Sequence, residues 1–323
     1  MSKRMTVSEV ATFLSTHDNF TLLSHASPDG DTIGASYALG YALKQLNKKV
    51  KVLCSDKIPT KFLFLTNTFN HDETADETIV SLDVADTKLL GSLEDEYKGK
   101  IELAIDHHVS NREFSANLLL DADASAACEI VYDILIELGV QFDRQILDAL
   151  YTGIITDTGC FKFSNTTART HIIAADLISR GVDYAEINRI MFDTKSRARV
   201  KIEGAVMDKM EYHFGGRVSF ITITREMLSE AGCDDSDLDG INALSRTIEG
   251  VMVGITVREK ESGKYKISLR TNAPIDASKV CAKFGGGGHI RAAGCEFGCT
   301  IEEVKEELLL AVKAELEEMG CLI

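Results

Sequence analysis

The sequence predicts an α/β protein of two domains, in which the larger N-terminal domain is built on a parallel sheet. The 323 residues are more than one hydrophobic core usually holds, so a second, smaller domain is expected. In the N-terminal half, short apolar runs alternate with helical patterns. Several of these runs end in Asp or His, and open α/β sheets bind their ligands at the carboxyl ends of parallel strands.

The elements of the N-terminal half follow from this alternation. Buried strands are expected at residues 20–25, 49–54, 78–83 and 100–105. Helices are expected at residues 7–16, 32–46, 124–138, 144–156, 167–180 and 184–191, with a short helix that begins near Pro59.

Polar side chains gather where three of these strands end. They are His25, Asp29, Asp31, Asp83, Asp106, His107 and His108. Bare burial of such groups costs several kcal/mol each, so they must be paired, hydrated or bound to a metal. Asp31 could instead be the N-cap of the helix that follows it. Three metal-competent residues within seven positions favour a ligand role.

Asp157 follows the apolar helix predicted at residues 144–156. It could be a solvated helix terminus. Gly153 before it and Gly159 after it favour a tightly packed site instead.

The C-terminal part has a different character. Residues 192–213 are basic and prone to form a helix, and they indicate a connector with a domain boundary near residue 195. Beyond it, strands are expected at residues 218–224, 251–259 and 264–270, and helices at residues 236–245, 277–283 and 301–319.

Four consecutive glycines precede His289 in this second domain. Since glycine loses much backbone entropy on folding, the run needs a cause. One cause is a loop in which Gly286, Gly287 and Gly288 bring backbone N–H groups to a phosphate, with His289 as a side-chain contact. The alternative is a flexible turn. Arg270 would be a second anion ligand, because its fork matches phosphate geometry, or else an ordinary surface charge.

Composition and charge exclude some classes of protein. The formal charge of −15 argues against binding of long nucleic acid through a broad basic surface, but not against a short nucleotide in a pocket. No apolar run approaches the roughly 20 residues of a membrane span, so we expect a cytoplasmic protein without membrane contact. The eight cysteines form no Cys-x-x-Cys pair and are interpreted as reduced structural thiols rather than zinc ligands or disulfides.

The candidate ligands define a chemistry. Five carboxylates in one cleft repel one another unless cations neutralise them. Mixed carboxylate and imidazole ligands without thiolate suit Mn²⁺, Mg²⁺, Fe²⁺ or Co²⁺, and their number suffices for two ions that share a bridging carboxylate. Two such ions can stabilise an in-line displacement at phosphorus, so phosphate-ester hydrolysis is the predicted reaction.

The motifs resemble those of the DHH phosphoesterases with a DHHA1 domain, in the right order over nearly the whole chain. They are His25-Ala-Ser-Pro-Asp-Gly-Asp31-Thr-Ile-Gly34, Asp83, Asp106-His107-His108, Asp157-Thr-Gly-Cys-Phe161 and Gly285 to His289. Within this family, the chain is most similar to the bacterial bifunctional oligoribonucleases that also hydrolyse 3′,5′-bisphosphate nucleotides. One departure is Ala35-Ser36 after Gly34, where many relatives have Ser directly after the glycine.

The resemblance implies a role for each position. His25, Asp29 and Asp83 would hold one ion, and Asp31, Asp83, His107 and Asp157 a second, usually Mn²⁺. His108 would contact the scissile phosphate and assist the leaving group, and Asp106 would be either a ligand or a support for one. His289 and Arg270, with Gly286, Gly287 and Gly288, would bind the substrate.

The resemblance also implies an organisation and a substrate class. Residues 1–192 would form the DHH domain, 193–212 a helical linker and 213–323 a smaller α/β DHHA1 domain, with the active site in the cleft between the domains. The substrates would be short single-stranded oligonucleotides and 3′-phosphoadenosine 5′-phosphate (pAp). Linear or cyclic dinucleotides are an alternative, as is a nucleotide-binding sensor without activity. A homodimer is compatible with the family.

Overall fold

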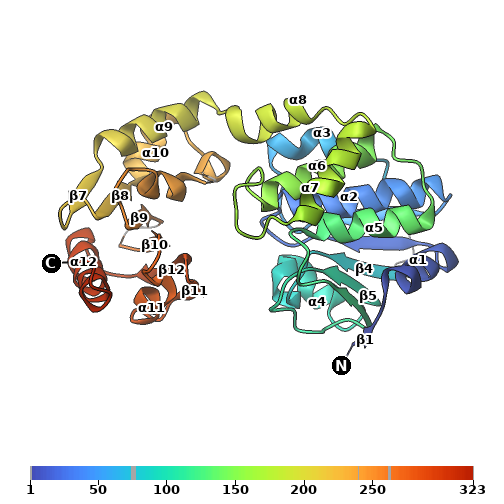
Figure 1. Cartoon of the computed structure of the whole chain (residues 1–323), viewed down its shortest axis with the longest axis horizontal. Helices are drawn as coiled ribbons and strands as arrows, with labels where there is room; N and C mark the ends of the chain where they lie inside the picture. The colour runs from blue at the N-terminus through green and yellow to red at the C-terminus, as the bar shows by residue number, and fades with distance from the viewer. Residues whose placement is uncertain (1, 74–77, 239, 261–262, 323) are drawn as a thin grey trace. The chain divides into compact units, whose positions relative to one another are not determined.

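The computed structural model describes residues 2–73, 78–238, 240–260 and 263–322 (Figure 1). The chain divides into two compact units, residues 1–194 and residues 195–323. Each unit has its own sheet and its own buried core. None of the helices in the described part of the chain is both long and apolar enough to cross a membrane.

The first unit is built on a parallel sheet, as the sequence predicts. Its described strands pair in the order β1-β6-β5-β4-β2-β3, and every pairing is parallel. These strands are β1 (Lys3–Arg4), β2 (Phe20–Leu23), β3 (Val50–Leu53), β4 (Thr78–Leu82), β5 (Leu103–Asp106) and β6 (Asn117–Leu120). Strands β1 and β6 were not predicted, because they are too short to show a periodic pattern.

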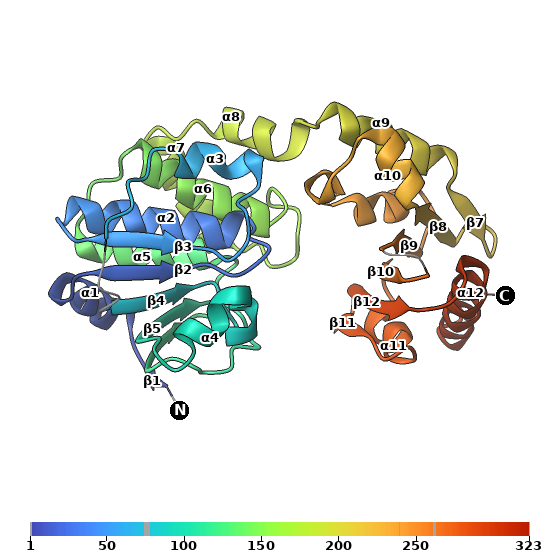
Figure 2. The same cartoon turned by 180° about the vertical axis from the view of Figure 1, so that it is seen from behind.

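Helices cover both faces of this sheet (Figures 1 and 2). The larger layer contains α1 (Val7–Thr16), α2 (Gly30–Gln45), α5 (Ala127–Leu138), α6 (Arg144–Asp157), α7 (Ala168–Ser179) and α8 (Tyr184–Asn188), which a π-helical turn, η3 (Arg189–Asp193), continues. Short helices complete the unit: η1 (Thr60–Phe62), α3 (Leu63–Thr66), η2 (Thr87–Leu93) and α4 (Glu94–Tyr97). A second buried cluster, which includes Leu90 and Tyr97, closes the face of the sheet opposite the main core.

Helices α2 and α6 approach each other very closely. A Cβ atom on Gly34 would lie 2.5 Å from the Ala149 carbonyl oxygen, and one on Gly153 would lie 2.2 Å from the Cys128 sulfur. Only glycine fits at these two positions, because real Cβ atoms do not come within 3.0 Å of such neighbours. This contact brings the C-terminal end of α6, with Asp157, beside the first turn of α2.

The chain changes direction in the sheet between β2 and β4. From β2 it moves outward to β3 and then returns to the other side of β2 as β4. Such a switch point leaves a crevice at the carboxyl ends of the two strands, where open α/β sheets bind ligands.

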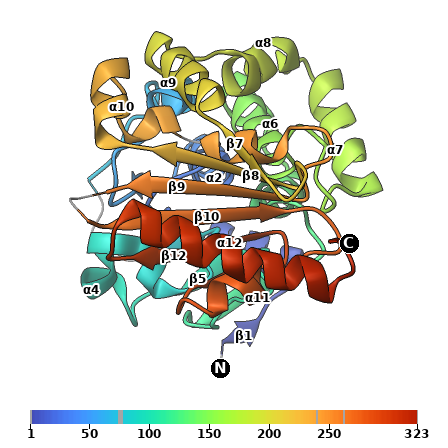
Figure 3. The same ribbon diagram turned by 90° about the vertical axis from the view of Figure 1, so that its left-hand side faces the viewer.

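The second unit has a mixed sheet in which the described strands pair in the order β11-β12-β10-β9-β8-β7. Only the β8–β9 pairing is parallel among those described. Its elements are α9 (Arg197–Asp208), β7 (Glu211–His213), β8 (Val218–Ile223), α10 (Arg225–Ala231), β9 (Val253–Glu259), β10 (Tyr265–Thr271), α11 (Ala277–Ala282), β11 (Gly287–His289), β12 (Ala292–Phe297) and α12 (Ile301–Glu318). Helix α12 lies across one face of the sheet (Figure 3).

The second unit differs from expectation in its helices, and strands β7, β11 and β12 were not among the strands expected. The helix predicted at residues 236–245 is wrong: two 3₁₀ segments, η4 (Asp235–Leu238) and η5 (Ile241–Arg246), stand there, and Asp239 lies outside the described residues. Gly240, with φ of 72°, ends any regular helix at this point. The predicted connector helix is α9, which packs into this unit because Ile202 and Val206 are buried against β8.

Candidate metal centre

The structure brings together most of the polar residues predicted from the strand ends. His25 follows β2, Asp83 follows β4, and His107 follows β5. Helix α2 contributes Asp29 and Asp31, and α6 contributes Asp157. Three groups have ligand atoms within 4.8 Å of one another: His25 with Asp29 and Asp83, Asp31 with His107 and Asp157, and Asp83 with His107 and His108.

Asp83 stands between the first two of these groups. Its Oδ2 lies 3.6 Å from His25 Nε2, which is also 3.6 Å from Asp29 Oδ1. Its Oδ1 lies 3.4 Å from His107 Nε2. Asp83 therefore presents one carboxylate oxygen to each group.

His107 gathers the second group. Its Nε2 lies 3.4 Å from Asp157 Oδ2 and 3.8 Å from Asp31 Oδ2. Two ligands bonded to one small cation at about 2.1 Å lie roughly 3.0–3.4 Å apart at octahedral to tetrahedral angles, so these separations are close to those of a ligand set.

Two buried atoms at the centre of the cluster have no hydrogen-bond partner among the described residues. They are Asp83 Oδ1 and His107 Nε2. Buried polar atoms are nearly always paired, so this exception requires an explanation. The residue types, the spacing and the two orphaned atoms fit a divalent cation.

Backbone carbonyl groups orient the two imidazoles of these groups. His25 Nδ1 is 2.7 Å from the Ala26 oxygen, and His107 Nδ1 is 3.1 Å from the Ala124 oxygen. A proton on each Nδ1 donates to its carbonyl, so the lone pair of each Nε2 faces the carboxylates. Metal-binding histidines are oriented in this way in general.

Asp31 lies in the first turn of α2, and Asp29 is the N-cap of that helix. The N-cap alternative for Asp31 is therefore wrong. Asp31 is fully buried, and its carboxylate accepts hydrogen bonds from the N–H groups of Ala127 at 2.5 Å and Cys128 at 2.9 Å. These donors start α5, whose N-terminal dipole stabilises the negative charge.

The protonation of the centre reflects its crowded charges. Burial and the neighbouring carboxylates Asp31 and Asp83 raise the pKa of Asp157 to about 9. Burial alone would lower the pKa of His25, but its contacts with Asp29 and Asp83 raise it to about 11. In the absence of cations, the cluster therefore retains protons that bound cations would replace.

Comparison with known proteins agrees with this geometry. The model of the DHH family, N-terminal domain, matches residues 19–154, and that of the DHHA1 domain matches residues 193–318. The bifunctional oligoribonuclease and PAP phosphatase NrnA of Thermus thermophilus is 33% identical over 93% of this chain and 91% of its own length. The NrnA of Bacillus subtilis is 24% identical over 88% of this chain and 91% of its own length.

The chain belongs to the DHH family, with a C-terminal DHHA1 domain.

Solved structures share this fold. An exopolyphosphatase-related protein from Bacteroides fragilis superposes with a TM-score of 0.86 at 25% identity, over 95% of this chain and 96% of that one. RecJ of Thermus thermophilus in complex with Mn²⁺ has a TM-score of 0.55 at 15% identity, over 95% of this chain and 55% of that one. This likeness to RecJ concerns the fold alone.

The first residue of the DHH motif, Asp106, has a supporting position. Its Oδ1 accepts hydrogen bonds from the backbone of His107 and His108 and lies 2.8 Å from His108 Nδ1. Its Oδ2 accepts from Asn111 Nδ2 at 2.6 Å. These donors occupy both oxygens, and Asp106 belongs to none of the three ligand groups.

His108 is thereby held with its Nδ1 proton toward Asp106, and Nε2 is the ring nitrogen that this hydrogen bond does not use. The hydrogen bond to Asp106 raises the pKa of His108, and its side chain is 42% exposed. Sequence reasoning missed Asn111, because nothing in its spacing distinguishes it from a loop residue. It also missed Asn165, whose Nδ2 donates to the Asp157 carbonyl at 3.2 Å and the Ser125 carbonyl at 3.1 Å.

In the DHHA1 domain, Arg270 and His289 lie on one face of the sheet. Both pair with Ala292, Arg270 from β10 and His289 from β11. Residues opposite one another in a sheet point to the same side. Arg246 stands near Arg270, since burial and the charge of Arg246 lower the pKa of Arg270. Sequence reasoning missed Arg246, because it ends a 3₁₀ segment far from the motifs.

The glycine run forms part of a hairpin, and Gly287 to His289 are strand β11. A Cβ atom on Gly286 would lie 2.2 Å from the Gly294 oxygen, and one on Gly288 would lie 2.6 Å from the Ala292 oxygen. The close approach of β12 thus explains why Gly286 and Gly288 are glycines, and this holds whether or not the run also contacts a ligand.

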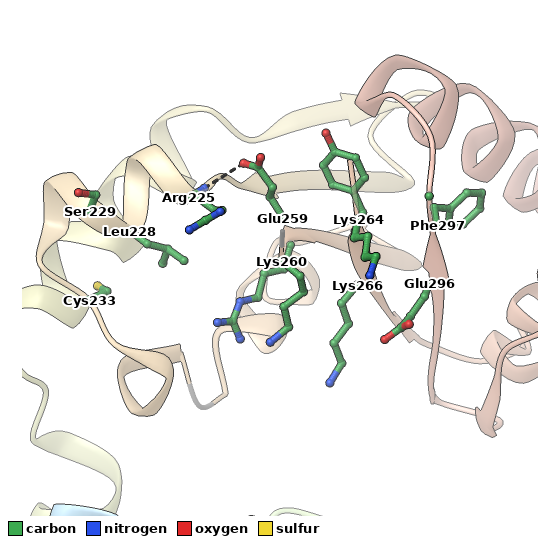
Figure 4. Close-up of a pocket in the computed structure, with 13 residues that line it drawn as sticks. Arg225, Leu228, Ser229, Cys233, Glu259, Lys260, Lys264, Lys266, Glu296 and Phe297 are labelled. Atoms are coloured by element: carbon green, nitrogen blue, oxygen red, sulfur yellow. Dashed lines mark hydrogen bonds between the residues drawn. The ribbon is translucent and has the colours of Figure 1, made fainter. Parts of the chain in front are cut away.

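A basic pocket of about 810 Å³ lies at the other end of this sheet (Figure 4). Five cationic side chains line it, together with Glu259 and Glu296: Arg225, Arg258, Lys260, Lys264 and Lys266. Lys266 and Arg270 are four residues apart on β10 and so share a face, about 13 Å from each other. In a chain of net charge −15, such a concentration of cations suits an anionic ligand.

Proposed function

We propose that this DHH phosphoesterase hydrolyses short oligonucleotides, such as dinucleotides and other nanoRNAs, to mononucleotides, and converts pAp to AMP. The observation that carries the proposal is the pair of orphaned buried atoms, Asp83 Oδ1 and His107 Nε2, within two ligand groups that Asp83 joins. The relatedness to the NrnA proteins supports the substrate class.

Two divalent cations would occupy the centre. His25, Asp29 and Asp83 would hold one ion, and Asp31, Asp83, His107 and Asp157 would hold the other. Mn²⁺ is the ion we expect, with Mg²⁺, Co²⁺ or Fe²⁺ as substitutes, and RecJ structures have been solved with Mn²⁺ and with Mg²⁺. When bound, such ions lower the pKa of water and stabilise negative charge that develops on phosphate oxygens.

His108 would act on the scissile phosphate. The hydrogen bond to Asp106 raises the pKa of His108 and so favours the protonated imidazole, whose Nε2–H would donate to a phosphate oxygen or to the leaving oxygen. Asp106 would position this ring through the bond to Nδ1 and stabilise its positive charge. Asp106 would thus act through His108 rather than as a ligand.

The DHHA1 domain would bind the rest of the substrate. Arg270 and His289 would contact a phosphate, assisted by the backbone of Gly286, Gly287 and Gly288. The shared face of Arg270 and His289, and the nearby Arg246, support a site for an anion.

The decisive experiment replaces Asp83 with asparagine. The Mn²⁺-loaded wild type and the variant are assayed on pAp, a linear dinucleotide and a cyclic dinucleotide, and Mn²⁺ binding is measured by calorimetry. Asp86→Asn is the matched control, because Asp86 is three residues away and caps η2, as asparagine also can, and its other contact is a 3.9 Å ion pair with the exposed Arg112. We expect Asp83→Asn to lose turnover and bound Mn²⁺, with Asp86→Asn unchanged.

The substrate arms decide between the alternatives. Faster turnover of the cyclic than of the linear dinucleotide and pAp would replace the proposal with a cyclic-dinucleotide phosphodiesterase. Binding without turnover of all three by the Mn²⁺-loaded wild type would indicate a sensor. Undiminished hydrolysis by Asp83→Asn would contradict the two-ion assignment.

A further inference from the structure

The turn that follows Asp157 has an unusual backbone. Gly159, Cys160 and Phe161 have φ angles of 55°, 59° and 63°, so three consecutive residues are in the left-handed region. Two of them are not glycine, and left-handed conformations of such residues persist only where the surroundings impose them. Residues held in this way cluster at functional sites.

Hydrogen bonds impose this conformation from both sides. The buried Thr158 accepts from the backbone of Lys162 and Phe163 through its carbonyl, and from the Phe161 N–H through its hydroxyl. Asn165 ties the far side of the turn to the carbonyl of Asp157. The turn is therefore fixed to the metal centre. It lies between α6 and α7 (Figure 1).

The two aromatic residues of the turn have opposite environments. Phe161 packs against the main core and stacks on His171, with ring centroids 4.9 Å apart. Phe163 is 54% exposed and is not part of the core. The core thus accounts for Phe161 and leaves Phe163 unexplained.

The ring of Phe163 lies against the backbone of Gly159. Three ring atoms of Phe163 lie 2.4–2.7 Å from where a Cβ of Gly159 would be, so the ring covers the bare backbone of this glycine. The Cα atoms of Gly159 and Asp157 are at most about 7.6 Å apart, because consecutive Cα atoms are 3.8 Å apart. An exposed aromatic face is therefore seated within one nucleoside's reach of a candidate metal ligand.

We infer that Phe163 is a stacking platform for the nucleobase next to the scissile phosphate. This inference rests on the proposed function and names the part of the substrate that the DHH domain recognises. Aromatic rings stack on any base, so the platform makes the enzyme selective for nucleotides over base-free phosphoesters, with little preference among bases.

Kinetics with and without a base test the inference. The wild type, Phe163→Ala and Phe163→Trp are assayed with Mn²⁺ on pAp and on ribose 3′,5′-bisphosphate, which lacks the base. We expect Phe163→Ala to raise the KM for pAp by about fivefold to a hundredfold and to leave kcat/KM for the base-free compound unchanged. Phe163→Trp should retain the wild-type KM. Ile172→Ala, an exposed apolar residue on α7, is the matched control.

Direct binding separates this inference from the proposed function. Calorimetry compares AMP with ribose 5-phosphate on each Mn²⁺-loaded protein. If Phe163→Ala loses the preference for AMP while its Mn²⁺ affinity is intact, the stacking platform is supported. This holds even if the enzyme turns over none of the substrates, and the proposed function alone would then fail. Equal effects on compounds with and without a base, or no effect on either, would overturn the platform.

Discussion

Replacing Asp106 with asparagine tests whether the first residue of the DHH motif supports His108 or binds a metal. The substitution keeps the size of the side chain but turns one acceptor oxygen into a donor. Asn111 Nδ2 already donates to Asp106 Oδ2 at 2.6 Å, and Asn111 cannot turn around, because its own oxygen accepts from the Glu113 N–H at 2.8 Å. Two donors would therefore face each other in a fully buried place.

The expected loss follows from these bonds. One hydrogen bond to a charged group contributes about 1.5–3 kcal/mol, so Asp106→Asn should lower the free energy of unfolding of the first unit by that amount. For a unit of 194 residues this corresponds to a fall in Tm of roughly 3–12 °C. Turnover of pAp should fall about 10- to 100-fold, as is usual when a residue that orients a site is lost.

The pH dependence of stability gives an independent check. Burial would raise the pKa of Asp106, but hydrogen bonds from His108 and Asn111 lower it below its usual value. A lowered carboxyl pKa stabilises the fold above the unfolded-state pKa of about 3.9, and this stability is lost as the pH falls through the folded-state value. The wild type should therefore lose more stability than Asp106→Asn when the pH is lowered below about 4.

Thermal unfolding, calorimetric titration with Mn²⁺ and hydrolysis of pAp measure these effects. The double variant Asp106→Asn with Asn111→Asp should regain part of the stability, because donor and acceptor are exchanged, but not the turnover, because the charge beside His108 is gone. Loss of one bound Mn²⁺ in Asp106→Asn would refute the reasoning and make Asp106 a ligand.

Three further predictions concern the rest of the site. Mn²⁺ binding at pH 7.5 should release protons and strengthen with rising pH. The reason is that the pKa values of about 11 for His25 and about 9 for Asp157 keep both groups protonated without cations. A binding enthalpy that does not vary among buffers of different ionisation enthalpy would contradict this prediction. Gly153→Ala should destabilise the first unit by about 1–3 kcal/mol in urea unfolding and weaken Mn²⁺ binding. The reason is that the new Cβ would meet Cys128 Sγ at 2.2 Å and Asp31 Oδ1 at 2.8 Å. The control is Gly204→Ala on α9, which should not destabilise the chain, because Gly204 has open space around it. His289→Ala should raise the KM for pAp roughly tenfold to a hundredfold and leave Mn²⁺ affinity unchanged. His213→Ala is the control, and it should change neither quantity. A loss of bound Mn²⁺ in His289→Ala would show that the role of His289 was misassigned.

The sequence alone predicted the parallel sheet through four of its described strands, β2 to β5, and most of the residues that meet at its edge. Strand periodicity is local, and parallel strands place their carboxyl ends together, so Asp83 and His107 could be brought near each other without coordinates. Motif order then predicted the family, which the comparisons confirm.

Tertiary structure decided how these residues are held. Asp31 accepts from Ala127, 96 positions along the chain, and His107 is oriented by a carbonyl 17 positions away. Asn111 donates a hydrogen bond to Asp106 Oδ2, and the ring of Phe163 lies against Gly159. Neither relation has a periodic signature. Hydrogen-bond partners come together where segments distant in the chain pack against each other. Local sequence patterns indicate which residues are polar, but they do not indicate which backbone or side-chain group will contact those residues.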